Sequence, residues 1–321
     1  MFGSTGWAAT ARRARHGVGA PTRRQRRSLP DNLFALLLMA PAALFLAVFV
    51  AWPLVKLLLD SLYQIAPLAG TKRYVGFGNY RNALSSPEFV GSAERTAIYT
   101  GIVVSLELTL GLATALLFNT LGRRSRVLRT VFLYPLMIAP IVAGLLWRFL
   151  LIDNFGIVNE LLTRVGILHT PAAISWLSDP NIVLFSVGLP DIWLTTSFMS
   201  LVLFAGLQNI PGELLEAARI DGANARQRFT WIVLPLLRPV IAVAVIVRGI
   251  DAARAFDVIL IQTNGGPQQK SETLSLLIYQ TMIRYGDPGL ASAMSVMYLL
   301  AMLVTAAVAL ATIWRPGRSQ A

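Results

Sequence analysis

The sequence reads Glu216-Ala217-Ala218-Arg219-Ile220-Asp221-Gly222 and, ten residues after that glycine, Ile232-Val233-Leu234-Pro235. This polar insert separates two long apolar segments. The residues from Glu213 to Ile220 are mostly good helix formers, and Gly222 is suited to end a short helix. Several small residues give the insert a surface that another backbone can approach closely, namely Ala217, Ala218, Gly222, Ala223 and Ala225.

The composition is that of a membrane protein. Of 321 residues 55% are hydrophobic and only 14% are charged, whereas a soluble domain has about 25% charged residues. The net charge of +12 does not indicate nucleic-acid binding, because the basic residues lie between apolar runs and do not alternate with stacking aromatics. The chain has no Cys, and His16 and His169 have no partner at metal spacing, so we expect no metal site and no thiol chemistry.

Six stretches are long and apolar enough to cross a bilayer, for which a helix needs about 20 residues. They are residues 33–59, 97–119, 128–151, 181–206, 236–261 and 289–314. The sequence therefore predicts an all-α membrane protein with six transmembrane helices. Residues 1–32 are an Arg-rich tail, 211–235 a loop, 315–321 a second tail, and Leu274–Ile283 a short surface helix. The first stretch is too long for a cleaved signal peptide.

The distribution of Lys and Arg predicts the orientation of these spans. If the N-terminus is cytoplasmic, the inner segments hold 17 basic residues and the outer segments hold seven. Basic residues concentrate on the cytoplasmic side of membrane proteins. We therefore expect both termini and the 211–235 loop to be cytoplasmic.

Motifs of nucleotide hydrolysis and of common hydrolases are absent. The chain has no Gly-Lys dipeptide, and hence no phosphate-binding loop of the Walker A type. An enzyme would have to use Asp251 and Asp257 as a carboxylate pair, which is poor geometry because six positions on one helix place them about 120° apart. The sequence predicts a protein that is not an enzyme.

The insert resembles a known family motif. Glu216-Ala217-Ala218, Gly222 after three further residues, and Ile232, Leu234 and Pro235 match the EAA motif of inner-membrane permease subunits of binding-protein-dependent ABC importers. Further segments, in the expected order, resemble the MalF-like carbohydrate branch of that family: Gly78-Asn79-Tyr80, Tyr134-Pro135 with Pro140 and Trp147-Arg148, Asn154 to Asn159, Phe256 to Ile259, Thr263 to Pro267, and Ala291 to Ser295.

This resemblance implies a type I importer core in a bacterial inner membrane, paired with a second, homologous permease as a heterodimer. It also implies two cytoplasmic ABC ATPases, which would bind the ATP and Mg²⁺, and an extracytoplasmic sugar-binding protein; no cofactor is expected on this chain. The insert would be the coupling helix that docks in the ATPase, with contacts from Glu216, Ala217, Ala218, Arg219, Asp221, Gly222 and Ala223. Glu216 near the helix start would complement the helix dipole. The alternative is an amphipathic helix lying on the membrane, although these residues offer little apolar bulk to anchor it.

Ionisable residues within spans are costly and point to function or pairing. Arg248, Asp251, Arg254 and Asp257 alternate in sign at a spacing of three, which predicts either a self-neutralising ladder on one helix or, near its outer end, groups that line a substrate path. The candidates for substrate contact are Asp191, Trp193, Arg254, Asp257, Asn264, Ser292 and Ser295, with helix packing as the alternative for each. Glu107 has no assigned role.

We expect the chain to be the permease of an ATP-driven importer that moves an oligosaccharide, a glycoside or a related polyol by alternating access. A glycerol phosphodiester or another small polar solute is an alternative cargo. An ion-coupled secondary transporter, using Asp191, Asp251 or Asp257 as ion ligands, is an alternative mechanism.

Overall fold

The computed structural model describes residues 31–122 and 125–313. The chain divides into two compact units, Met1–Pro53 and Leu54–Ala321. In the first unit α1 (Asp31–Leu46) continues through one π-helical turn (Ala47–Ala51) into the start of α2 (Trp52–Asp60). The predicted tails lie outside the described residues, apart from Asp31 and Asn32, which begin α1.

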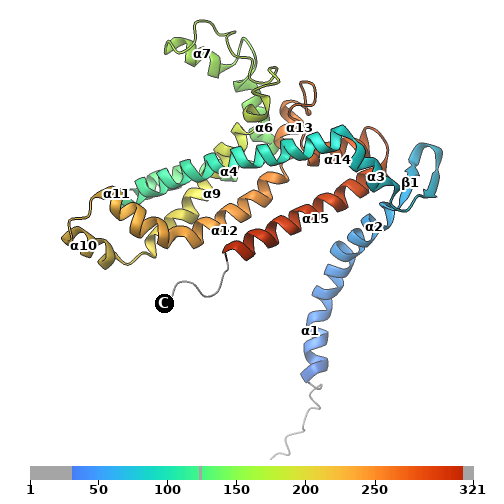
Figure 1. Cartoon of the computed structure of the whole chain (residues 1–321), viewed down its shortest axis with the longest axis horizontal. Coiled ribbons are helices and arrows are strands. Elements are labelled where there is room, and N and C mark those ends of the chain that lie inside the picture. The colour runs from blue at the N-terminus through green and yellow to red at the C-terminus, as the bar shows by residue number, and fades with distance from the viewer. Residues whose placement is uncertain (1–30, 123–124, 314–321) are drawn as a thin grey trace, which may run out of the picture. The chain divides into compact units, whose positions relative to one another are not determined.

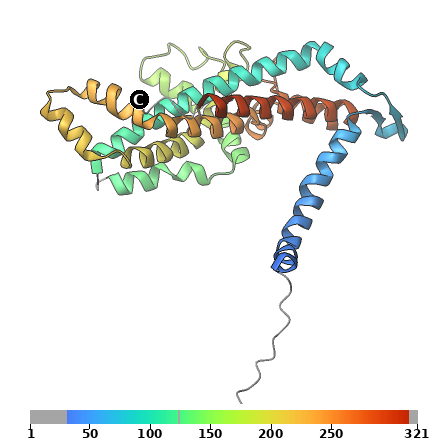
Figure 2. The same cartoon turned by 60° about the horizontal axis from the view of Figure 1, so that its bottom comes forward.

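Four long helices form the body of the second unit: α4 (Pro87–Leu121), α9 (Leu189–Gln208), α12 (Leu234–Ala253) and α15 (Pro288–Ile313). Figures 1 and 2 show them running alongside one another. Ser86 caps α4 by accepting a hydrogen bond from the Phe89 backbone N–H, and Pro87 occupies the first helical position, where no N–H is needed. Counting the helix that ends at Asp60, five helices of the described chain are long and apolar enough to cross a membrane, or up to six if one bent pair counts as a span.

The bent pair occupies the span predicted for residues 128–151. α5 (Ser125–Phe132) and a 3-10 turn (Tyr134–Met137) precede α6 (Pro140–Leu150), and the axes of the two parts differ by 96°. Pro135 and Pro140 have no N–H to donate, and a residue before proline avoids the helical conformation. Ala139 accordingly has an extended backbone with ψ of 135°. The predicted span is therefore broken at its prolines.

The spans predicted at 181–206 and 236–261 are also interrupted. A single turn, α8 (Val183–Ser186), precedes α9, and α12 ends at Ala253 before a separate short helix, α13 (Asp257–Gln262). The break after α12 frees backbone carbonyls, and side chains from elsewhere satisfy two of them. Tyr298 donates to the Ala253 carbonyl (2.5 Å) and Thr273 to the Ala255 carbonyl (3.3 Å).

One end of the bundle carries small elements that surround the start of α4. A hairpin of β1 (Tyr63–Ala66) and β2 (Thr71–Tyr74), joined by a 3-10 turn (Pro67–Ala69), is followed by α3 (Gly78–Ser85). The Asn79 amide donates to the carbonyls of Ser61 and Tyr63, both at 2.9 Å. α14 (Leu274–Ile283) also lies here, but Leu276 is fully buried, so the predicted surface helix is part of the core.

The opposite end carries α10 (Gly212–Ile220), α11 (Ala225–Arg228) and a π-helical turn (Phe229–Val233) that leads into α12 (Figure 1). The Gln208 amide donates to Asn119 Oδ1 (2.9 Å), so the C-terminal ends of α4 and α9 meet at this end. At the other end Arg95 Nε donates to the Glu272 carbonyl (2.9 Å). α10 and the turn before α14 are therefore separated by the length of α4. α7 (Ile157–Arg164) lies beyond α6, away from the bundle.

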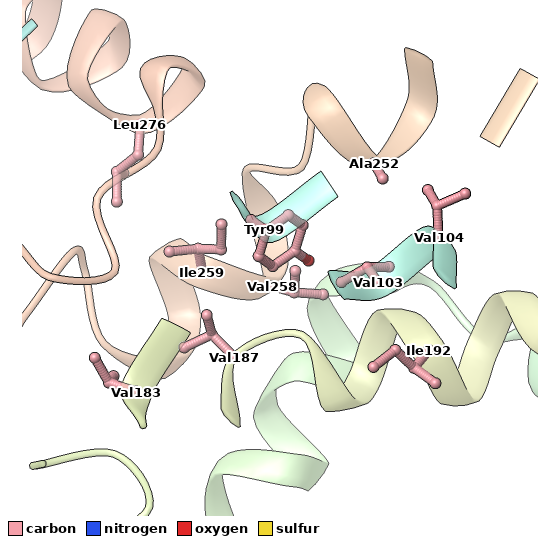
Figure 3. Close-up of a cluster of buried hydrophobic side chains, with 10 residues drawn as sticks. All are labelled: Tyr99, Val103, Val104, Val183, Val187, Ile192, Ala252, Val258, Ile259 and Leu276. Atoms are coloured by element: carbon pink, nitrogen blue, oxygen red, sulfur yellow. The ribbon is translucent and has the colours of Figure 1, made fainter. Parts of the chain in front are cut away.

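Apolar side chains of the described residues form three buried clusters in the bundle. The smallest, of Ala83, Phe89, Leu274, Leu277 and Met294, joins α3, α4, α14 and α15, and two larger clusters lie along the long helices. The one shown in Figure 3 joins α4, α8, α9, α12, α13 and α14 and contains Tyr99, Val103, Val104, Val183, Val187, Ile192, Ala252, Val258, Ile259 and Leu276. The other, nearer α10, contains Ala115, Met199, Leu203, Leu207, Leu237 and Ala244. Close approach of α4 to α9 depends on Gly111, since a Cβ there would lie 2.7 Å from Met199 Cγ and 3.1 Å from the Ser200 backbone nitrogen.

Gly111→Ala should therefore lower the unfolding free energy of the detergent-solubilised protein by about 1–3 kcal/mol, the usual cost of overpacking a tight core. Gly101→Ala is the matched control, because Gly101 lies on the same helix and no neighbouring atom lies within 4 Å of the place that its Cβ would take. Thermal and denaturant unfolding would measure both. Equal stability of the two variants would contradict the close contact between α4 and α9.

Candidate functional site

The predicted coupling segment is an exposed short helix with a left-handed stop. α10 spans Gly212–Ile220, and Gly222 follows with φ of +80°. The Ala223 N–H donates to the Ala218 carbonyl (2.9 Å) and the Gly222 N–H to that of Arg219 (3.1 Å), which closes the end of the helix. A side chain at position 222 would strain this turn even though no neighbour crowds it.

The loop after α10 is tied to the next helix. Asn224 caps α11 in a reciprocal capping box with Gln227, and Arg228 Nη1 donates to the Ala223 carbonyl (2.6 Å). Ile220 is 88% exposed, which leaves an apolar side chain at the tip of the segment uncovered. The prediction that Glu216 complements the helix dipole was wrong, because Glu216 is the fifth residue of α10 and Glu213 occupies the first turn.

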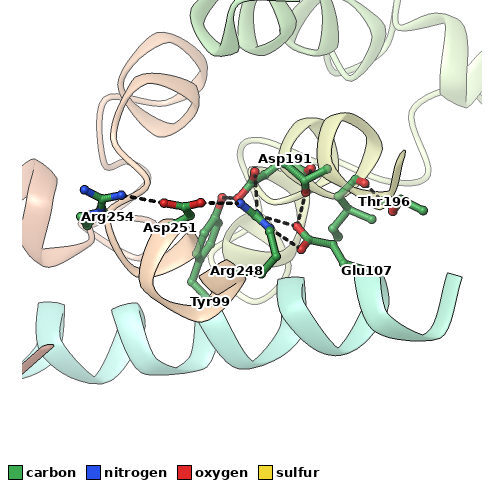
Figure 4. A network of polar contacts seen from close by, with 9 residues as sticks. Tyr99, Glu107, Asp191, Thr196, Arg248, Asp251 and Arg254 are labelled. Carbon is green, nitrogen blue, oxygen red and sulfur yellow. Dashed lines mark hydrogen bonds and ion pairs between the residues drawn. The ribbon is translucent and has the colours of Figure 1, made fainter. Parts of the chain in front are cut away.

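A buried cluster of charges joins the three central helices (Figure 4). Arg248 of α12 donates from Nε to Glu107 Oε2 and from Nη2 to Glu107 Oε1 of α4, both at 2.8 Å. Arg248 Nη2 also donates to Asp191 Oδ1 of α9 (3.3 Å). Glu107 is fully buried and Arg248 is 6% exposed, so this is a bidentate ion pair inside the apolar bundle.

Neighbouring polar groups complete the cluster. Thr195 donates a hydrogen bond to Glu107, and the Tyr99 hydroxyl donates to Asp191 Oδ2 (3.3 Å). At the edge of the cluster Asp251 Oδ2 lies 3.8 Å from Arg248 Nη1, and Asp251 Oδ1 accepts a hydrogen bond from Arg254 Nη2 (2.6 Å). We refer to Glu107, Asp191 and Arg248 as the central charge cluster.

The predicted four-member ladder is only partly present. Arg248, Asp251 and Arg254 pair in sequence, but Asp257 belongs to α13, a separate helix, and its side chain is exposed in the first turn there. The prediction of a four-member ladder on one helix assumed that this helix continued to residue 261, whereas α12 ends at Ala253. The prediction that Asp257 is the fourth member of the ladder was therefore wrong.

The other proposed substrate contacts are spread over several elements. Trp193 is 37% exposed, its ring centroid lies 6.3 Å from that of Trp147, and both side chains line a mostly apolar cavity of about 490 Å³. Asn264 adopts φ of +51° in the turn after α13 and accepts a hydrogen bond from Gln280. Ser295 donates to the Ala291 carbonyl of its own helix, and Ser292 is half-buried. Their contact with substrate stays a prediction.

A second ion pair, between a half-buried arginine and a buried glutamate, holds the turn between α13 and α14. Arg95 Nη2 lies 3.9 Å from Glu272 Oε2, and Ser92 donates to the same oxygen at 3.4 Å. Burial raises the pKa of the Glu272 carboxyl, and the nearby Arg95 charge opposes this. Within the described ranges no group of three or more acidic, His or Cys side chains is placed to hold a metal ion.

Comparison with known proteins identifies the class. Residues 107–313 match the family of binding-protein-dependent transport system inner membrane components, and the chain belongs to that family. The matched region begins at Glu107 and contains α10 and the rest of the central charge cluster.

Two named relatives are permeases of sugar transport systems. The chain is 38% identical over 280 residues to the sulfoquinovosyl glycerol transport system permease protein SmoG of Agrobacterium fabrum, covering 87% of this chain and 90% of SmoG. It is 37% identical over 267 residues to the trehalose/maltose transport system permease protein MalF of Thermococcus litoralis, covering 83% and 89%.

A solved structure shows the same fold. The chain superimposes on a chain of a bacterial alginate ABC transporter, crystallised in complex with an alginate pentasaccharide-bound periplasmic protein, with a TM-score of 0.74 at 22% identity. The superposition covers 89% of this chain and 96% of that one. The predicted family and fold class are thereby confirmed, and the chain is an inner-membrane permease component whose relatives are transport subunits.

Sequence reasoning missed the partner of Glu107. The signal was present, since a charge alone in an apolar span requires an opposite charge on a neighbouring helix. Arg248 and Asp191 were both recognised as intramembrane charges. However, Arg248 lies 141 residues from Glu107 along the chain, and Asp191 lies 57 residues from Arg248, so the sequence gave no indication that they are in contact.

Arg248→Met should destabilise the protein by about 3–5 kcal/mol, because it leaves the Glu107 charge buried without its partner. The double variant Glu107→Gln/Arg248→Met should recover the part of that loss that comes from Glu107, while Asp191 keeps only its hydrogen bond from Tyr99. Unfolding in detergent would measure the stability of both variants. The control is Glu160→Gln/Arg164→Met, which removes an exposed ion pair within α7. A double variant as unstable as Arg248→Met would contradict the pairing.

Proposed function

We propose that this chain is one permease half of an ATP-driven importer and that α10 is its coupling helix. The observation that supports this most directly is the EAA segment, which folds as an exposed helix ended by Gly222 at one end of the bundle. A small-residue helix that projects from two long spans suits a groove on a partner protein. The chain itself has no phosphate-binding loop, so ATP and Mg²⁺ would be bound by two partner ATPases.

The proposed orientation places α10 in the cytoplasm. The C-terminal ends of α4 and α9 meet beside α10, and α5, which follows α4 in the chain, carries Arg126 and Arg129. This concentration of arginine at the α10 end agrees with the excess of basic residues on cytoplasmic surfaces. The Asn264 turn and α14 would then face the extracytoplasmic side.

The proposed cargo is a sugar, as an oligosaccharide, a glycoside or a related polyol. The two relatives named above serve sulfoquinovosyl glycerol and trehalose/maltose, and the superimposed structure belongs to an alginate transporter. By the same reasoning we propose an extracytoplasmic sugar-binding protein as the donor and a second, homologous permease as the other half. A glycerol phosphodiester or another small polar solute remains the alternative cargo.

The proposed cycle is alternating access. Closure of the ATPases on ATP would move α10, and the spans attached to both of its ends would tilt so that the cavity opens outward. Hydrolysis would return the spans and open the cavity inward. Binding energy of ATP to the closed state is what shifts the equilibrium between the two arrangements.

An ion-coupled secondary transporter would need a free intramembrane carboxylate as a ligand. Asp191 and Asp251 are instead engaged by Arg248 and Arg254, which disfavours these two as ion ligands and leaves Asp257 as a candidate ligand for this mechanism. Transport by the purified chain alone, driven by an ion gradient, would overturn the choice of an ATP-driven importer.

Gly222→Trp should abolish ATPase docking, because a side chain strains the left-handed turn and a bulky ring would displace the tip of the segment from its partner. Glu216→Lys should do the same by reversing the charge on the exposed helix. Co-purification of the ATPases with affinity-tagged permease measures docking, and the amount of permease in membranes measures insertion. Glu160→Lys on α7 is the control. Normal ATPase recovery with both variants would refute the coupling role.

Asp257→Ala should impair sugar uptake more than it impairs assembly, because the carboxylate is exposed at the start of α13 and holds no observed structural contact within the described chain. Uptake over a range of sugar concentrations would show a reduced rate at equal transporter abundance. Unchanged uptake kinetics would remove Asp257 from the substrate path.

A further inference from the structure

The central charge cluster lies at the junction of the two larger apolar clusters. On α4 Glu107 falls between Val104, which belongs to the cluster of Figure 3, and Ala115, which belongs to the cluster nearer α10. On α12 Arg248 likewise falls between Ala252 and Ala244. The charges therefore connect α4 and α12 between two regions that are packed mainly by apolar side chains, with neutral hydrogen bonds such as that of Gln208 to Asn119.

Apolar packing and an ion pair constrain these helices in different ways. Dispersion and apolar contact are not directional, so helices held by them alone can shift along one another at modest cost. The guanidinium of Arg248 presents a planar fork that matches the two oxygens of Glu107 at 2.8 Å each, and this geometry is lost with a small shift of either helix. Asp191 brings α9 into the same constraint.

We infer that Glu107 and Arg248 are positioning residues that lock α4, α9 and α12 into one rigid lever, which carries motion of α10 to the opposite end of the bundle. The inference rests on the proposed function of α10. Its geometric basis is that α9 and α12 are the two spans attached to the α10 segment, and both are bonded through Arg248 to α4. At the far end α4 holds the turn before α14 through Arg95 and Glu272.

A buried ion pair is not required for stability, because a well-packed apolar substitute of similar volume is often as stable. The double variant Glu107→Gln/Arg248→Met tests this distinction. It removes the two charges of the Glu107–Arg248 pair, keeps similar volumes and avoids leaving Glu107 ionised alone, while Asp191 keeps its hydrogen bond from Tyr99. A purely structural role predicts normal transport once the double variant is stable, whereas a lever predicts futile ATP hydrolysis.

The experiment uses the complete transporter in proteoliposomes and measures sugar moved per ATP hydrolysed. We expect the double variant to recruit the ATPases and hydrolyse ATP while this ratio falls by about fivefold or more, the range of a typical coupling free energy. Arg248→Lys, which keeps the charge but not the fork, should lie between the double variant and the wild type. Glu160→Gln/Arg164→Met removes an exposed pair within one helix and should couple normally.

A second measurement needs no variant of the cluster. Because the chain has no Cys, Leu117→Cys on α4 and Leu236→Cys on α12 give two unique exposed positions for spin labels, provided the partner subunits are cysteine-free. We expect the same distance distribution between the labels without nucleotide and with ATP bound. A distance that changes between these states, or wild-type coupling in the double variant, would overturn the lever. Loss of ATPase recruitment by the α10 variants is scored separately, so failure of the lever and failure of the coupling helix are distinguishable.

Discussion

A guanidinium group inside an apolar bundle has to be neutralised in place, and Arg248 imposes that requirement on the three central helices. Its fork fixes Glu107 of α4 at two points, and its Nη2 also donates to Asp191 of α9. Thr195 and Tyr99 complete the hydrogen bonds of the two carboxylates. The relative positions of α4, α9 and α12 follow from this arrangement together with the close contact at Gly111, and α10 is held between two of the three helices.

The positions of the apolar helices could be predicted because hydropathy over about 20 residues reflects a property of each segment alone. Their interruptions could not. α12 ends at Ala253 where hydroxyls of Tyr298 and Thr273 supply hydrogen bonds to freed carbonyls, and both residues lie in later segments. The 96° bend before α6 had a local signal in Pro135 and Pro140, but proline in a membrane helix is also compatible with a mild kink.

The candidate sites divide in the same way. The EAA segment could be located from sequence because its helix formers and its glycine act within one short stretch, and the structure adds the left-handed φ at Gly222. Glu216 does not complement the helix dipole as predicted, because α10 begins four residues before it, at Gly212. The pairing of Glu107 with Arg248 depends on how α4 and α12 are placed side by side, and nothing in either segment alone encodes it.

The length of α6 has a consequence for the surroundings of the molecule. Eleven residues at about 1.5 Å each extend for about 16 Å, roughly half of a hydrocarbon core about 30 Å thick. The Ile138 N–H and the Ala139 carbonyl at the proline-bearing start of α6 are hydrogen-bonded to neighbouring backbone, but no such partner is seen within the described chain for the Ile138 carbonyl and the Ala139 N–H. Within the hydrocarbon core these two groups cannot be left against acyl chains, since lipid offers no hydrogen bonds to unpaired amides and carbonyls. In the intact membrane this flank must face protein or water, so the annulus of lipid around the chain is interrupted there.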